Sequence, residues 1–212
     1  MDKIISELRN EYKRQELLEK DINKDPLLQF KKCLDEAIDA KVPEPTAMNF
    51  CTVSDEGKPS SRIVLLKGIS NSGLSFYTNY HSRKGKELKN NPNASITFFW
   101  PELERQVRIE GKVKRTDAKT SEEYFHSRPK GSQIGAYISP QSDEISREQL
   151  QKFKEEAEKK FSTIDVPRPE HWGGYELEPD YFEFWQGRPS RLHDRIIFEK
   201  KDNNWIIKRI AP

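Results

Sequence analysis

The run RLHDR near the end of the chain combines two arginines with a histidine. Side chains of an extended strand alternate between its two faces, so Arg191, His193 and Arg195 are expected on one face. Leu192 and Asp194 would lie on the other. Three cationic or titratable groups on one face repel each other unless an anion or an electron-rich ring lies against them. The alternative is a solvated strand face with Asp194 as partner, but the adjacent runs WQG and IIFEK favour a site.

A second pair of cations, Arg62 and Lys67, flanks the apolar residues of the run RIVLLK. Because they are five residues apart, they point to opposite faces of a regular strand. One site can use both only if the strand bends or bulges; otherwise the two side chains hold different anions. The spacing alone fits a buried strand flanked by two surface charges equally well.

A third candidate lies where a predicted strand ends at Tyr77 and Thr78 and a predicted helix begins at Ser82. Free backbone N–H groups and the helix dipole favour an anion at such a helix start. Arg83 and Lys84 in the first turn are unfavourable for the helix itself, and a bound anion would offset that cost. An exposed helix with ordinary surface lysines is the more usual interpretation of SRK alone.

A fourth candidate combines Tyr124 and Arg128, one helical turn apart, with Ser132 beyond a predicted turn at Pro129 and Gly131. Two hydroxyls and a guanidinium suit the oxygens of a phosphate. The local pattern fits a core tyrosine beside a surface arginine slightly better than it fits a site.

The elements that must position these residues are mainly strands. Asp25 and Pro26 predict a helix start, because aspartate is a favourable cap and proline is tolerated at the first helical position. Strands are predicted at 47–54, 61–69, 74–79, 94–100, 105–116, 181–185, 191–200 and 204–210, and further helices at 82–92, 120–129 and 144–161. Many short strands with inserted helices favour an antiparallel barrel with helical additions. Residues 1–20 are predicted to be a loose helical arm, and residues 21–212 a single domain.

Composition limits the protein class. The apolar fraction of 33% suits a modest core, and the aromatic fraction of 10% argues against disorder. A net charge of +2 indicates no general affinity for polyanions, so the local basic excesses favour discrete anion sites. Cys33 and Cys51 form no metal-binding spacing, and no metal is expected. The charged N-terminus and the absence of a long apolar run predict no signal peptide and no membrane span, hence a cytoplasmic location.

Together these runs resemble the pyridoxine/pyridoxamine 5'-phosphate oxidase family. The matching runs are LRNEY, EPTAM, RIVLLK, FYTN, SRKGKEL, LERQVRIEG, YFHSRPKGSQIGA, SPQS, WGGY, EFWQG, RLHDR and RIAP. They extend from about Leu8 to Pro212, and their order and spacing make chance similarity improbable. The resemblance implies a homodimeric split β-barrel with FMN at the subunit interface.

The resemblance also implies roles for individual residues. The FMN contacts would be Arg62, Ile63, Val64, Leu65, Leu66, Lys67, Tyr77, Thr78, Arg83, Lys84, Gln106, Gln141, Ser142, Trp185 and Arg195. The substrate contacts would be Lys67, Tyr124, Arg128, Ser132, Arg191 and His193, with Arg9 and Tyr12 closing over the substrate. Arg191 and His193 would be catalytic and assist proton removal, and Arg195 would favour negative charge on the reduced flavin. Arg62 and Lys67 would then serve two different phosphates.

The implied reaction oxidises pyridoxine or pyridoxamine 5'-phosphate to pyridoxal 5'-phosphate, with O2 as acceptor and H2O2 as product. Three alternatives remain open at this point. A flavin reductase of the same fold would not need Tyr124, Arg128 and Ser132 together. A β-barrel that binds single-stranded nucleic acid would show a steep salt dependence. A carrier would bind pyridoxal phosphate without turnover.

Overall fold

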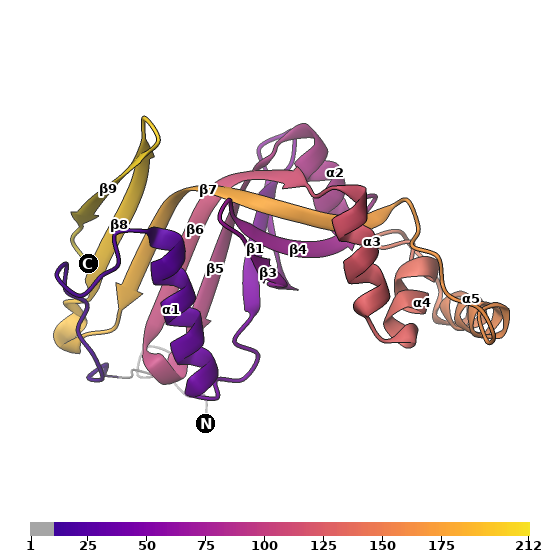
Figure 1. Ribbon diagram of the computed structural model, residues 1–212, viewed down its shortest axis with the longest axis horizontal. Helices are drawn as coiled ribbons and strands as arrows, with labels where there is room; N and C mark the ends of the chain where they lie inside the picture. Colours follow the sequence, from indigo (N-terminus) through magenta and orange to yellow (C-terminus); the bar gives the residue numbers. More distant parts are fainter. Residues whose placement is uncertain (1–10) are drawn as a thin grey trace, which may run out of the picture. The chain divides into compact units, whose positions relative to one another are not determined.

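The computed structural model describes residues 11–212 (Figure 1). The helices are α1 (Pro26–Asp39), α2 (Arg83–Asn90), α3 (Ala118–Ser127), α4 (Lys130–Ile138) and α5 (Arg147–Lys160), with short 3-10 helices at Pro101–Leu103 and Pro189–Arg191. The strands are β1 (Ala47–Val53), β2 (Pro59–Leu65), β3 (Gly68–Ile69), β4 (Leu74–Asn79), β5 (Asn93–Trp100), β6 (Arg105–Arg115), β7 (Trp172–Gln186), β8 (Asp194–Lys201) and β9 (Asn204–Arg209).

The two helix starts predicted from capping residues are confirmed. The Asp25 carboxylate accepts hydrogen bonds from the first-turn N–H groups of Leu27 and Leu28. Ser82 accepts one from the N–H of Gly85 at the start of α2. Both contacts satisfy backbone donors that have no partner inside the helix.

The strands join in the order β2-β1-β5-β6-β7-β4-β3, with β8 on β7 and β9 on β8. The pairs β3–β4, β4–β7, β7–β8 and β8–β9 are all antiparallel. The predicted fold class, mainly antiparallel β with added helices, is confirmed.

The chain divides into two compact units. The first comprises Ser95–Glu110, Pro179–Pro212 and the described part of Met1–Asn49. Its core contains α1 and aromatic strand residues. Phe30 packs on Phe98 with the ring centres 5.0 Å apart, and Phe184 meets Phe198 edge to face. The paired strands β7 to β9 lie beside each other in this unit (Figure 1).

The second unit comprises Phe50–Ala94 and Gly111–Glu178. Here β4 pairs with the first half of β7, with Asn79 opposite Trp172 and Thr78 opposite Gly173. Helices α3, α4 and α5 gather together (Figure 1). Their shared core consists of Phe125, Ile134, Ala157, Phe161, Val166 and Trp172. Trp172 therefore belongs both to a strand and to the core beneath the helices.

Three local predictions were wrong. The strand predicted at 191–200 begins only at Asp194, because a 3-10 helix covers Pro189–Arg191 and Ser190 and Arg191 have positive φ angles of 56° and 61°. The shared strand face of Arg191, His193 and Arg195 therefore does not exist. Residues 11–20 contain no helix, and residues 1–10 of the predicted arm lie outside the described residues.

Helix α4 was missed because Pro129 and Gly131 were interpreted as a turn. Pro129 precedes the first residue of α4, a position that costs the helix no hydrogen bond. The predicted strand at 181–185 is the final part of β7, which has 15 residues and begins at Trp172.

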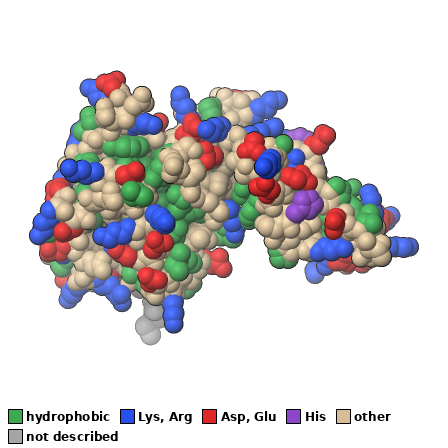
Figure 2. Space-filling view, in the orientation of Figure 1, with side chains coloured by type: hydrophobic (Ala, Val, Ile, Leu, Met, Phe, Trp, Pro, Cys, Tyr) green, Lys and Arg blue, Asp and Glu red, His purple; other side chains and the backbone are tan. Residues whose placement is uncertain are grey.

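Basic and acidic side chains are intermingled over the face drawn in Figure 2. No large area of one sign is visible on that face. Among the helices within residues 11–212, none combines the length and the apolar character needed to cross a membrane.

Candidate active site

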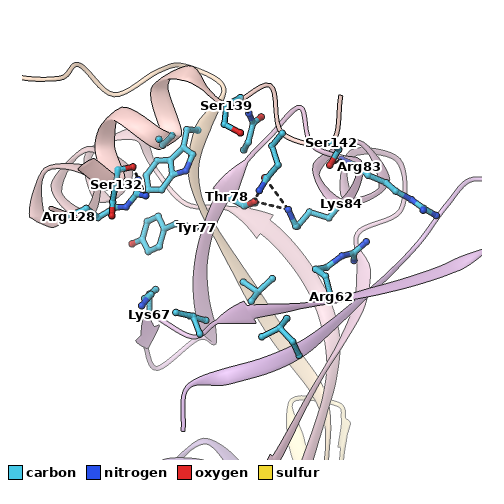
Figure 3. Close-up of a pocket in the computed structure, with 18 of the residues that line it drawn as sticks. Arg62, Lys67, Tyr77, Thr78, Arg83, Lys84, Arg128, Ser132, Ser139 and Ser142 are labelled. Atoms are coloured by element: carbon cyan, nitrogen blue, oxygen red, sulfur yellow. Dashed lines mark hydrogen bonds between the residues drawn. The ribbon is translucent and has the colours of Figure 1, made fainter. Parts of the chain in front are cut away.

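The second unit contains a cavity of about 1030 Å³ (Figure 3). Its lining residues are Ser60 to Leu65, Lys67, Tyr77, Thr78, Asn79, Arg83, Lys84, Tyr124, Arg128, Pro129, Ser132, Gly135, Ala136, Ser139, Gln141, Ser142 and Trp172. Small-molecule sites usually occupy a few hundred to about 1,000 Å³, so this cavity has room for a large ligand or for two smaller ones.

The cavity receives both Arg62 and Lys67 because the strand between them is interrupted. Strand β2 ends at Leu65 and β3 begins at Gly68, and the N–H of Lys67 already bonds to Ser75 O at 2.8 Å. Beyond this break the alternation of β2 no longer applies. Figure 3 places Arg62 and Lys84 at one end of the cavity and Lys67, Arg128 and Ser132 at the other, where Tyr77 also lies.

A polar network holds Arg62 at the first end. Its Nη1 donates to Thr52 Oγ1 at 2.5 Å, and its Nη2 donates to Ser60 Oγ at 2.6 Å. The buried Glu87 carboxylate lies 3.4 Å from Nη2 and accepts a hydrogen bond from Arg83 Nε at 2.9 Å. Burial raises the pKa of Glu87, but hydrogen bonds from Thr52, Arg83 and Ser60 and the charge of Arg62 lower it further, so the net shift is downward. An ionised Glu87 therefore orients two cations of the cavity.

Lys84 lies at the same end, in the first turn of α2. Its Nζ donates to Thr78 Oγ1 at 2.9 Å and to Gln141 Oε1 at 3.2 Å, both of them neutral acceptors. Burial and the nearby charge of Arg62 lower the pKa of Lys84 to about 8. The chain passes close by at Gly85, where a Cβ would lie 2.2 Å from Tyr80 O, so only glycine fits. A buried ammonium that has no carboxylate partner within the described part of the chain suits an anionic ligand.

The other end combines aromatic rings with Arg128. The Nη2 of Arg128 donates to Ser132 O at 2.8 Å, while its buried Nη1 has no hydrogen-bond partner among residues 11–212. Tyr124 stacks on Tyr77 with ring centres 3.7 Å apart. Burial raises the pKa of Tyr124, against the opposing charge of Arg128, so its hydroxyl stays protonated at neutral pH and can donate to an anion.

A separate cluster in the first unit contains Tyr12, Trp185 and His193. The His193 ring centre is 4.7 Å from that of Trp185 and 5.8 Å from that of Tyr12. Arg188 donates its backbone N–H to His193 Nδ1 at 3.1 Å. Burial, and then the charge of Arg191, lower the pKa of His193.

Arg195, also in the first unit, is bound to a carboxylate. Its Nε and Nη2 donate to the two oxygens of the buried Glu183 at 2.8 and 3.0 Å, and its Nη1 donates to Ala211 O. This bidentate pairing raises the pKa of Arg195 and offsets its charge.

The structure thus brings together most of the predicted site residues. Those that line the cavity are Arg62, Ile63, Val64, Leu65, Lys67, Tyr77, Thr78, Arg83, Lys84, Tyr124, Arg128, Ser132, Gln141 and Ser142. Leu66 is instead buried in the hydrophobic core. Gln106, Tyr12, Trp185, Arg191, His193 and Arg195 belong to the first unit, and Arg9 lies outside the described residues.

Sequence reasoning missed several lining residues, chiefly Ser60, Ser139 and Trp172. The run WGGY carried a signal for Trp172, since two glycines beside an aromatic residue often mark a close approach of chain segments. A Cβ at Gly173 would lie 2.1 Å from the Tyr80 hydroxyl, which confirms such an approach.

Two family models match this sequence. The one described as pyridoxamine 5'-phosphate oxidase matches residues 34–160, and the one described as pyridoxine 5'-phosphate oxidase C-terminal dimerisation region matches residues 172–212. Curated relatives named pyridoxine/pyridoxamine 5'-phosphate oxidase include one from Mannheimia succiniciproducens, 53% identical over 97% of both chains. Another, from Acaryochloris marina, is 49% identical over 98% of this chain and 95% of its own.

Solved structures show the same fold. PhzG from Burkholderia lata, in complex with tetrahydrophenazine-1-carboxylic acid, is 31% identical with a TM-score of 0.88, over 92% of this chain and 98% of its own. A pyridoxamine 5'-phosphate oxidase-related, FMN-binding protein from Nostoc punctiforme is 15% identical with a TM-score of 0.72, over 90% of this chain and 100% of its own. The second likeness concerns the fold alone.

Proposed function

The chain belongs to the pyridoxamine 5'-phosphate oxidase family, and on that premise we propose that it oxidises pyridoxine or pyridoxamine 5'-phosphate to pyridoxal 5'-phosphate, with FMN as cofactor and O2 as acceptor, giving H2O2. The observation that supports this most directly is a cavity that has cationic groups at two separate ends. A phosphate monoester carries about −1.5 to −2 charges at pH 7, and the proposed cofactor and substrate each carry one.

The first end of the cavity fits the FMN phosphate. Arg62 and Lys84 supply two cations there, and the Arg83 N–H and the Ser142 hydroxyl, 3.2 Å apart, supply further polar groups near the start of α2. Among residues 11–212, the hydrogen-bond partners of Lys84 Nζ are neutral oxygens, so an arriving phosphate would give the ammonium a counter-charge. Bound FMN would supply the two-electron acceptor of the reaction.

The second end fits the substrate phosphate. Lys67 and Arg128 provide the charge, and Tyr124 and Ser132 provide hydroxyl groups. Arg128 Nη1 is buried and has no hydrogen-bond partner among residues 11–212, which is costly, and a phosphate oxygen would satisfy it. These groups at the second end would favour a substrate that carries the 5'-phosphate over the same compound without it.

His193 is better suited to donate a hydrogen bond than to accept a proton. The N–H of Arg188 can only donate, so Nδ1 of His193 must be the acceptor and the proton of the neutral ring lies on Nε2. The lowered pKa of His193 keeps that form present at neutral pH. We therefore assign His193 to binding and orienting a polar atom of the substrate, in place of the proton removal expected from the sequence.

A homodimer completes this proposal, and the dimerisation-region match supports it. FMN would lie at the subunit interface, where Gln106, Trp185, Arg191 and Arg195 would join the site. Arg195 is already paired with Glu183, which also accepts a hydrogen bond from Arg108, so the charge of Arg195 would be only partly offset there. A cytoplasmic location remains a prediction.

Two other functions have less support. Tyr124, Arg128 and Ser132 line the same cavity, and a flavin reductase would not need these three phosphate-binding groups together. Nucleic-acid binding usually uses a continuous basic surface, and the charges on the face in Figure 2 are mixed.

Anaerobic mixing of the FMN-loaded protein with pyridoxamine 5'-phosphate tests the proposal. We expect the flavin absorbance near 450 nm to bleach, and to recover with formation of peroxide when air is admitted. Bleaching by a nicotinamide cofactor alone would favour the reductase. Binding of pyridoxal 5'-phosphate without any bleaching would favour the carrier.

A further inference from the structure

Three aromatic rings form a nearly parallel group in the wall of the cavity. The planes of Tyr77 and Trp172 differ by 17°, those of Tyr124 and Trp172 by 5°, and those of Tyr77 and Tyr124 by 18°. The Arg128 guanidinium carbon lies 4.5 Å from the centre of the Trp172 ring. Trp172 thus connects the aromatic group to the cation at the second end of the cavity.

Arg128 has few other restraints on its guanidinium. Its Nη2 bonds to Ser132 O, its Nη1 is buried without a partner among residues 11–212, and the Phe125 ring is more distant, at 5.8 Å. Burial lowers the pKa of Arg128, which reflects how little compensation the surroundings offer. One hydrogen bond fixes one nitrogen but leaves the plane free to rotate, so the indole face is the remaining restraint.

Trp172 is itself held rigidly. It is only 6% exposed, packs edge to face on Phe125, and pairs with Asn79 across the strands β4 and β7. Arg168 also donates to its carbonyl oxygen at 2.7 Å. A rigid indole offers the strongest cation–π surface among the side chains, and phenylalanine offers a weaker one.

We propose that Trp172 is a positioning residue, which holds the Arg128 guanidinium flat so that Nη1 faces the phosphate of the substrate. This inference rests on the proposed function, because it assigns Arg128 to the substrate end of the cavity. Trp172 contributes through Arg128, so its removal should weaken binding of the phosphorylated ligand and leave the FMN end unchanged.

The test compares Trp172→Leu and Trp172→Phe with the wild type, using Trp100→Phe as a matched control. Trp100 is equally buried but lies in the first unit. We expect Trp172→Leu to raise the KM for pyridoxamine 5'-phosphate by about 3- to 30-fold, the range of a desolvated cation–π contact, with a smaller change in kcat. The KM of Trp172→Phe should lie between those of the wild type and Trp172→Leu. The KM of Trp100→Phe should stay within about twofold of the wild-type value.

A double-mutant cycle separates positioning from general damage. On the Arg128→Met background, Trp172→Leu should raise the Kd for pyridoxal 5'-phosphate by less than about twofold, since the group that it positions is gone. The Kd for FMN, measured by flavin fluorescence quenching, should stay within about twofold of the wild-type value when Trp172→Leu is introduced on either background.

Equal effects of Trp172→Leu on both backgrounds would overturn the inference, as would an unchanged KM in a folded variant. If Trp172→Leu does not fold, Trp172→Phe carries the same comparison. The titration with pyridoxal 5'-phosphate needs no turnover. Failure of the wild type to bleach its flavin would therefore count against the proposed function, and equal effects in the cycle would count against Trp172.

Discussion

The two ends of the cavity hold their cations in different ways. At the first end, Arg62 and Lys84 donate to hydroxyl, amide and carboxylate oxygens of the protein. At the second end, Arg128 lies against an indole and keeps one buried nitrogen without a partner among residues 11–212. The cationic donors at the first end already have hydrogen-bond acceptors in the protein before a ligand binds, whereas Arg128 at the second end lacks one for Nη1 within the described part of the chain. We expect the first to suit a cofactor that stays and the second a substrate that exchanges.

The largest expected effect comes from removing the unsatisfied cation. Arg128→Met should lower kcat/KM for pyridoxamine 5'-phosphate by about 100-fold, because it deletes a buried charge-assisted contact to phosphate. The Kd for FMN should change by less than about twofold, since Arg128 lies at the other end. Arg147→Met, on the exposed face of α5, is the control and should change neither quantity. A parallel loss of FMN affinity would show that the two ends are not separate.

The reciprocal change at the first end should be somewhat smaller. Arg62→Met should raise the Kd for FMN by about 10- to 50-fold, because a cation is lost and Glu87 loses a partner. The Kd for riboflavin, which has no phosphate, should rise much less. Fluorescence titration of the apo-protein measures both. If Arg62→Met weakened riboflavin and FMN equally, Arg62 would be supporting the fold and not contacting the phosphate.

The first end should also respond to pH in a specific way. The pKa of Lys84 is about 8 before an anion binds, so the ammonium is lost as the pH rises through that value. The affinity for FMN should therefore fall between about pH 8 and pH 9.5, by at most about tenfold per pH unit. Lys84→Arg, which stays charged, should remove most of this fall. A wild-type affinity that is constant up to pH 9.5 would contradict the proposed contact.

The smallest effect, that of His193→Gln, should distinguish a donor from a base at this position. His193→Gln places an amide nitrogen about where Nε2 lies, so it should keep kcat/KM within about fivefold. His193→Ala should lose about 10- to 50-fold, because the hydrogen bond is gone. Steady-state peroxide production measures both. A glutamine variant as poor as the alanine variant would restore the role of proton acceptor, and wild-type turnover in both Arg191→Ala and His193→Ala would remove these residues from the mechanism.

Much of the fold was predictable because its signals are local. The helix start at Asp25, the helix start at Ser82 and the strand predicted at 105–116 all correspond to the structure. The wrong predictions concern residues whose conformation depends on distant contacts. Nothing in the composition of the run SRLHDR signals the positive φ angles at Ser190 and Arg191.

The site could be predicted only in part for a similar reason. Arg62 and Lys67 could be identified as candidates from the sequence. Both line one cavity because the strand is interrupted between β2 and β3, and no residue of RIVLLK indicates that interruption. Trp172 reaches the cavity through its register opposite Asn79, about ninety residues away along the chain. Pairings at that distance leave no periodic pattern in a single sequence.

The central claim is that two phosphates bind at two independent ends of one cavity. The most direct test is a cross-comparison of Arg62→Met and Arg128→Met, in which the Kd for FMN and the Kd for pyridoxal 5'-phosphate are measured in each folded variant. The account predicts that Arg62→Met weakens FMN much more than pyridoxal 5'-phosphate, and that Arg128→Met does the reverse. Comparable loss of both ligands in both variants would contradict it.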